Sequence, residues 1–220
     1  MRISKLLLGS VAVSALLIAP LSGVAAAKPP KNPHPHPHPH APNKLTCFDG
    51  HSEGTIYGGR CTIKGHPEQG PATLDNREND PDGDYAGVYV PHSAMSGKLL
   101  SNVKKLGYNY KGNITPTPGN LSLNVPLDEN NDGDTEQYAF IDAAHDAQHC
   151  PGKNGHVDII KSKTCGIFLS DSTFFPNWAA LVAAHPTWKV ATDNPPIVIA
   201  ERTPSDPPAK WKVDHVQFGK

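Results

Sequence analysis

From residue 45 onward, short segments of alternating apolar and polar residues recur, separated by clusters of Gly, Pro, Asn and Asp. The clearest are residues 104–110 and 121–125, where apolar side chains occupy every second position. A period of two is the signature of a strand with one buried face. Because 23 prolines and 19 glycines are spread over 220 residues, long helices are disfavoured. The pattern therefore predicts a mainly β domain.

The same periodicity predicts further strands at 87–90, 138–141, 157–160, 196–200 and 213–218. One short helix is expected as well. Pro176 suits the first turn of a helix, and Trp178, Leu181 and Val182 then form an apolar stripe. Many short strands with one short helix predict an antiparallel, jelly-roll-like β-sandwich over residues 45–220.

The first residues have the layout of an export signal. A short basic start precedes an apolar stretch at 6–24, and Ala25 and Ala27 are small residues of the kind that signal peptidase reads. A membrane anchor is the alternative, but Gly, Ser and Pro interrupt the stretch, and a span needs roughly 20 apolar residues. We therefore predict a cleavable signal at 1–27 and a secreted, extracellular chain that begins at Lys28 and has no membrane span.

Residues 28–44 are low in complexity and contain a run, 33–40, in which proline and histidine alternate. Such a run is incompatible with helix or sheet, so the segment is predicted to be a disordered, extended spacer. In such a chain the imidazoles lie on one side, where two or three could share a transition-metal ion. The histidines concerned are His34, His36, His38 and His40. A metal-handling protein is therefore one functional hypothesis.

Four cysteines remain in the mature chain. An even number in an exported protein predicts two disulfides, and the short separations favour Cys47–Cys61 with Cys150–Cys165. A four-cysteine zinc site is the alternative, but no C-x-x-C pair is present.

The most specific motif is a run of oxygen-bearing side chains with a glycine inside it. Its members are Asp128, Asn130, Asp132, Asp134 and Glu136. Oxygen ligands at alternate positions around a Gly turn are typical of the start of an EF-hand calcium loop. The twelfth position is Ala139, where that motif requires glutamate. The alternatives are thus a Ca²⁺ site and a solvated turn between two strands.

A second, smaller acidic cluster surrounds Gly83. Asp80, Asp82 and Asp84 alternate there, which makes them a weaker calcium candidate. Among the tryptophans, Trp178 is expected in the core because it lies on the apolar helix stripe. Trp188 is the candidate for an exposed ring that stacks on a sugar.

Residues 85–91 (YAGVYVP) and 211–218 (WKVDHVQF) resemble strands of jelly-roll modules in secreted bacterial proteins. The second is similar to the closing strand of carbohydrate-binding modules, where an aspartate often lies between apolar residues. The resemblance implies a β-sandwich and suggests sugar binding.

No complete catalytic motif is visible, and a formal net charge of −1 does not favour nucleic acid as a partner. We therefore expect a monomeric, non-catalytic protein that binds a carbohydrate or another cell-envelope component, with Ca²⁺ as the candidate cofactor. The rivals are a polysaccharide hydrolase that uses paired carboxylates and a metal-handling protein that uses the histidine tract.

Overall fold

The computed structural model describes residues 45–49, 58–65, 71–78, 80–81, 83–90, 95–117, 119–143 and 155–219. All of these belong to one compact unit. The predicted signal, the histidine-rich spacer and Cys150 lie outside them. No helix within these ranges is long and apolar enough to cross a membrane.

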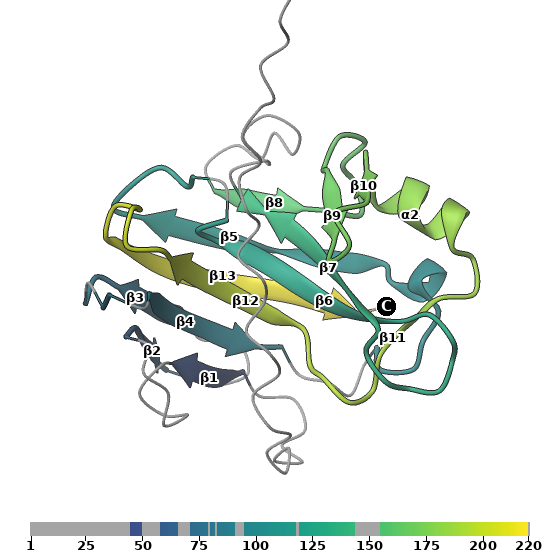
Figure 1. The fold of residues 1–220 in the computed structure, drawn as a ribbon, viewed down its shortest axis with the longest axis horizontal. Helices are drawn as coiled ribbons and strands as arrows, with labels where there is room; N and C mark the ends of the chain where they lie inside the picture. The colour runs from purple at the N-terminus through teal and green to yellow at the C-terminus, as the bar shows by residue number, and fades with distance from the viewer. Residues whose placement is uncertain are drawn as a thin grey trace, which may run out of the picture. The chain divides into compact units, whose positions relative to one another are not determined.

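Two antiparallel sheets make up the domain (Figure 1). We call the eight-stranded one sheet A. In spatial order it contains β1 (Thr46–Asp49), β4 (Asp84–Tyr89), β12 (Ile197–Arg202), β6 (Ser122–Asp128), β7 (Gln137–Asp142), β9 (Ile167–Leu169) and β10 (Phe174–Phe175), and β11 (Lys189–Val190) pairs with β6. Sheet B has five strands: β2 (Arg60–Ile63), β3 (Ala72–Asn76), β13 (Ala209–Gly219), β5 (Lys105–Gly112) and β8 (His156–Asp158).

The strand pairing is that of a jelly roll. In sheet B, β13 pairs with β3 and β5, and β5 pairs with β8. In sheet A, β12 pairs with β4 and β6, and β6 pairs with β7. Eight strands, β3 to β8 together with β12 and β13, thus pair from the outside inward: β3 with β13, β4 with β12, β5 with β8 and β6 with β7. Successive pairs alternate between the two sheets, as in a rolled-up hairpin. The predicted β-sandwich is confirmed, and all seven predicted strands are present.

A single apolar core fills the space between the sheets. Leu121, Leu123, Val125 and Leu127 point into it from β6 and the residue before it, and all are nearly inaccessible. The intervening residues Ser122, Asn124 and Pro126 lie on the opposite face of β6, as the period of two predicts, but they are buried as well. Trp178 and Trp211 are both core residues, which confirms the expectation for Trp178.

The predicted helix is present as α2 (Trp178–Ala184), but it begins two residues later than a start at Pro176 would place it. The side chain of Asn177 caps it by accepting a hydrogen bond of 2.9 Å from the backbone N–H of Ala180. Pro176 therefore precedes the cap instead of lying in the first turn. A short 3₁₀ helix, η2 (Leu100–Asn102), precedes β5.

The predicted Cys47–Cys61 disulfide is confirmed, and it joins the two sheets. Cys47 lies on β1 of sheet A and Cys61 on β2 of sheet B. Cys165 is fully buried and also disulfide-bonded. The pairing of Cys165 with Cys150 stays a prediction, because Cys150 lies outside the described ranges.

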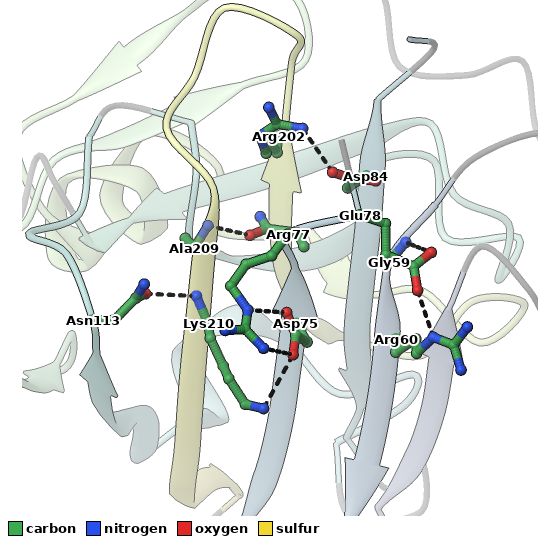
Figure 2. Close-up of polar contacts among 11 residues, drawn as sticks. Gly59, Arg60, Asp75, Arg77, Glu78, Asp84, Asn113, Arg202, Ala209 and Lys210 are labelled. Atoms are coloured by element: carbon green, nitrogen blue, oxygen red, sulfur yellow. Dashed lines mark hydrogen bonds and ion pairs between the residues drawn. The ribbon is translucent and has the colours of Figure 1, made fainter. Parts of the chain in front are cut away.

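A buried ion pair connects β4 and β12 within sheet A (Figure 2). The Arg202 guanidinium donates to the Asp84 carboxylate at 2.8 Å, and both side chains are almost fully inaccessible. Arg202 also donates through Nε to the backbone carbonyl of Asp206 at 3.1 Å. Asp84 and Arg202 are direct register partners, so the pair holds the two strands in one alignment.

Breaking this pair should destabilise the domain strongly. We expect Asp84→Asn to lower the free energy of unfolding by about 3–5 kcal/mol, because it removes the negative charge that faces the buried Arg202 guanidinium. Urea unfolding measures the effect. The matched control is Arg77→Gln, which removes an exposed ion pair with Asp75 and should cost under about 1 kcal/mol. Equal effects of the two substitutions would contradict the structural role of the buried pair.

Candidate functional site: the outer face of sheet A

Four aromatic rings gather on the outer face of sheet A near its β10 edge. Phe140 of β7 is the register partner of Phe168 of β9, which in turn pairs with Phe174 of β10. The Phe168 and Phe174 ring centroids are 4.8 Å apart, and Tyr138 stacks on Phe140 at 6.2 Å. Phe174 is 46 % exposed. We call these four residues the aromatic platform.

The platform rings face away from the core because of strand alternation. Ala139 and Ile141 of β7 point inward, so Tyr138, Phe140 and Asp142 share the outer face. On β9, Ile167 and Leu169 are core residues and Phe168 lies between them. A large exposed aromatic side chain on a sheet face is the less usual arrangement, because burial would stabilise it. The platform is therefore a candidate binding surface.

A pair of carboxyl groups lies beside the platform on the same face. Asp142 follows Phe140 by two residues on β7, and the backbone N–H of Gly119 donates to its carboxylate. Glu201 comes from β12, where Val198 and Ala200 point into the core and Glu201 points outward. Burial, and next the negative charge of Asp142, raise the pKa of Glu201 to about 7. We call Asp142 and Glu201 the carboxyl pair.

Asn120 and Thr117 adjoin the carboxyl pair. The Glu201 backbone N–H donates to the Asn120 carbonyl at 3.3 Å, so these residues are neighbours across β12 and the chain that leads into β6. The Asn120 side-chain oxygen accepts from the Thr117 N–H at 3.0 Å. Within the described part of the chain, the buried amide nitrogen of Asn120 and the hydroxyl of Thr117 have no hydrogen-bond partner. Polar atoms left in this state are rare and point to a missing partner.

We call residues 128–136, which contain the predicted calcium ligands, the acidic loop. It starts at the end of β6 and leads directly into the platform strand β7. Oxygen atoms of Asp128, Asp132 and Glu136 lie within 4.8 Å of one another, which is close enough to hold one cation. The structure thus brings together three of the five predicted ligands. Asn130 instead donates its amide to Glu136 at 3.0 Å, and Asp134 is not part of the group.

Backbone geometry holds the acidic loop in its curved shape. Asp128 accepts from the N–H groups of Asn131 (2.6 Å) and Gly133 (3.1 Å). Gly133 has a φ of +99°, in the region that favours glycine, and its carbonyl accepts two hydrogen bonds from Thr192. Burial, and next the charge of Glu136, raise the pKa of Glu129. A cation would relieve this crowding of negative charge.

The second acidic cluster does not offer a comparable set of ligands. One carboxylate oxygen of Asp84 faces Arg202 inside the sandwich, and the other accepts from the Asp80 N–H at 3.3 Å. Asp82 lies outside the described ranges. Arg202 already supplies a positive charge at Asp84, so a second cation there is disfavoured.

Trp188 is only partly exposed. It packs against the core, and its ring stacks on His185 with centroids 3.5 Å apart. Since His185 covers one face of the indole, a sugar would have only the opposite face. The prediction that Trp188 binds a ligand is not tested by this geometry, but Phe174 offers more free ring surface.

The outer face of sheet B has a different character. Asp75 of β3 accepts from Arg77 at 2.7 Å and lies 3.1 Å from Lys210 of β13 (Figure 2). The hydrogen bond from Arg77, with Lys210 contributing, lowers the pKa of Asp75 to about 2, against some desolvation. Arg60 and Glu78 form a further exposed pair. Charges of both signs neutralise each other on this face, so sheet A carries the stronger binding candidate.

Sequence reasoning did not find the platform or the carboxyl pair. Tyr138 and Phe140 were within a predicted strand, but Phe168 and Phe174 come from short segments with no clear periodicity. Their meeting depends on the pairing of β7, β9 and β10. Glu201 and Asp142 are 59 positions apart (201 − 142) and carry no shared motif.

No protein-family model matches the chain, and none of the curated proteins compared with it shows significant similarity. The function has to be argued from the geometry.

The raised pKa of Glu201 makes stability depend on pH. The folded pKa of about 7 exceeds the ordinary value of 4.5. The stabilisation that Glu201 gives the folded state is fully present at pH values below its ordinary pKa, and it is lost as the pH rises through 7. We expect the free energy of unfolding to fall by up to about 3 kcal/mol between pH 5 and 9. The Glu201→Gln substitution should remove this dependence of stability on pH. Urea unfolding of both proteins across that range measures it. Parallel pH profiles would contradict the assignment.

Proposed function

We propose that this protein is a secreted, monomeric, non-catalytic module that binds a glycan of the cell envelope on the outer face of sheet A. The observation that carries the proposal is the aromatic platform, in which three rings occupy register positions on adjacent strands. Flat rings offer apolar surface to the C–H faces of sugars. The row extends across three strands, which suits an extended chain of sugar units.

Polar groups beside the platform support the same proposal. Binding sites typically combine apolar and aromatic surface with a few placed polar groups. Here Asp142 and Asn120 lie at one end of the platform strand, and Ser170 and Gln137 hydrogen bond to each other at the other end, at 2.8 Å. Sugar hydroxyls both donate and accept, so they can pair with all of these groups.

Export is part of the proposal. The predicted signal at 1–27 motivates it, and a disulfide that joins the two sheets suits an oxidising compartment. The histidine tract would then act as a spacer between the signal and the domain.

We further propose that Ca²⁺ binds the acidic loop through Asp128, Asp132 and Glu136. Their oxygen atoms are hard ligands, and their mutual distances are compatible with a single ion. The loop lies near the platform: Thr135 donates a hydrogen bond to Asp193, and burial, and next the charge of Asp193, raise the pKa of Tyr138 to about 12. Calcium would thus order the loop that leads into β7.

Removing a platform ring should weaken glycan binding without unfolding the domain. We expect Phe174→Ala to lower affinity for a bound polysaccharide about tenfold, which corresponds to about 1.4 kcal/mol. A glycan array identifies the ligand, and titration calorimetry measures the affinity. The matched control is Phe48→Ala, which removes a partly buried ring at the opposite edge of sheet A that packs edge-to-face against Tyr89. If Phe174→Ala binds as tightly as the native protein, the platform is not the binding surface.

Calcium should stabilise the folded protein. At a hundredfold excess over Kd, a ligand of the folded state adds about 2.7 kcal/mol, or several degrees in Tm. We expect millimolar Ca²⁺ to raise the Tm, EGTA to lower it, and Asp132→Asn to abolish the difference. Asp171→Asn is the control, because Asp171 makes a similar turn hydrogen bond, to Thr173, outside the cluster. Identical melting curves with Ca²⁺ and EGTA would show that the loop is only a turn.

A further inference from the structure

The outer face of sheet B contains one row of residues that differs from its neighbours. The row crosses four strands through register partners: Thr62 of β2 lies opposite Thr73 of β3, and Lys212 of β13 lies opposite both Thr73 and Lys111 of β5. We call these four residues the basic row. Both lysines are exposed, whereas Val213, next to Lys212 in the chain, points into the core. The row therefore faces solvent and carries positive charge without a carboxylate of its own.

The surroundings of the basic row balance its charge only in part. Lys111 and Lys212 are direct register partners, and like charges on directly opposite residues destabilise a sheet. The Lys212 ammonium lies 3.9 Å from the Asp214 carboxylate, which also contacts the His215 ring at 2.8 Å. Within the part of the chain that the structure describes, Lys111 forms no ion pair. The two lysines thus lack a carboxylate placed between them.

The neighbouring row cannot supply that carboxylate, because its acidic side chain is already shared by two cations. Asp75 lies 2.7 Å from Arg77 and 3.1 Å from Lys210 (Figure 2). Lys210 is two residues before Lys212 on the same face of β13, about 7 Å along the strand. Positive charge therefore continues from this row into the basic row.

The side chains of the basic row define the chemistry of a complementary ligand. Lysine ammonium groups pair with anions such as carboxylates and phosphates. The hydroxyls of Thr62 and Thr73 can both donate and accept hydrogen bonds, as sugar hydroxyls can. Lys111 and Lys212 are about 5 Å apart across the strands, so one anionic group can contact both. Cations beside hydroxyls on an open face therefore favour a sugar chain that carries negative groups.

Two other anionic partners fit this face less well. Proteins that bind single-stranded nucleic acid stack its bases on aromatic side chains. Here Tyr108, Tyr110 and Trp211 of β5 and β13 pack in or against the core and not on the outer face. Binding to an anionic membrane surface usually adds apolar side chains that enter the bilayer, and the basic row contains none.

We propose that the basic row binds an acidic polysaccharide through the carboxylate groups of its sugar units. The inference goes beyond the proposed function, because it assigns a second class of ligand to the other outer face of the sandwich and does not depend on the aromatic platform. Lys111 and Lys212 pair with a carboxylate of the sugar chain, which offsets their mutual repulsion. Thr62 and Thr73 hydrogen bond to hydroxyl groups of the same chain.

The test compares oligomers of galacturonate with their methyl esters, which keep the sugar backbone but carry no charge. Titration calorimetry on the mature protein is done in EGTA, so that calcium cannot bridge the acidic loop to the probe. A buffer of about pH 7.5 keeps free imidazole mostly neutral, which limits any contribution from the histidine tract. We expect the acid form to bind at least about tenfold more tightly than the ester. Its affinity should fall as salt is added.

Substitutions in the basic row locate the binding. Lys111→Gln and Lys212→Gln should each lower the affinity for the acid form about threefold, and the double variant about tenfold. Lys111→Arg keeps the charge and should bind almost as the native protein does. The matched control is Lys98→Gln, which removes the same charge from an exposed lysine outside the strands of sheet B and should leave the affinity unchanged.

Several outcomes would overturn the inference. The first is equal affinity for the acid form and the ester, and the second is an equal loss of affinity in Lys98→Gln and Lys111→Gln. Single-stranded DNA or phosphatidylserine vesicles that bind as tightly, with the same dependence on Lys111, would also overturn it, because the row would then be a general polyanion surface.

The same measurements keep the basic row and the aromatic platform apart. Phe174→Ala should leave binding of the galacturonate oligomer unchanged, and Lys111→Gln should leave binding of the platform glycan unchanged. Loss of galacturonate binding in Phe174→Ala would assign that ligand to the platform and overturn the inference, while the proposed function would stand. Failure of the platform glycan to respond to Phe174→Ala would overturn the proposed function and leave the basic row intact.

Discussion

The buried ion pair of Asp84 and Arg202 constrains the strands on which the candidate site depends. Its two members are register partners on β4 and β12, and both point into the sandwich. Because side chains alternate along a strand, burying Arg202 places Glu201 on the opposite, outer face. A slip of one residue would turn Glu201 toward the core and Arg202 toward the outer face, leaving Asp84 without its counter-ion. The position of the carboxyl pair therefore follows from a charge inside the protein.

The two outer faces of the sandwich present different kinds of side chain. On sheet B, charged side chains such as Asp75, Arg77 and Lys210 neutralise one another, as expected for a solvated surface. On sheet A, three phenylalanine rings occupy register positions on three adjacent strands. This contrast supports the proposal that a ligand would bind on sheet A.

The elements around the platform are short, so local reinforcement matters for its geometry. β9 and β10 contain only three and two residues, and the backbone pairs of so short a ladder contribute little by themselves. The adjacent acidic loop is held by Thr192 and by hydrogen bonds to Asp128. The Cys47–Cys61 disulfide acts at the opposite edge, where it joins β1 to β2. Calcium binding at the loop would give the platform edge a comparable support.

The sequence alone determined the fold class, the strands at seven segments, the helix and the Cys47–Cys61 pairing, because periodicity and short cysteine separations are local signals. It also identified the acidic loop, of which Asp128, Asp132 and Glu136 converge. Only the tertiary structure placed Phe140, Phe168 and Phe174 in one row and Glu201 beside Asp142. Those contacts join strands that are distant in the chain, and strand order in a jelly roll is set by how the whole core packs. No local pattern encodes which outward-facing residues become neighbours.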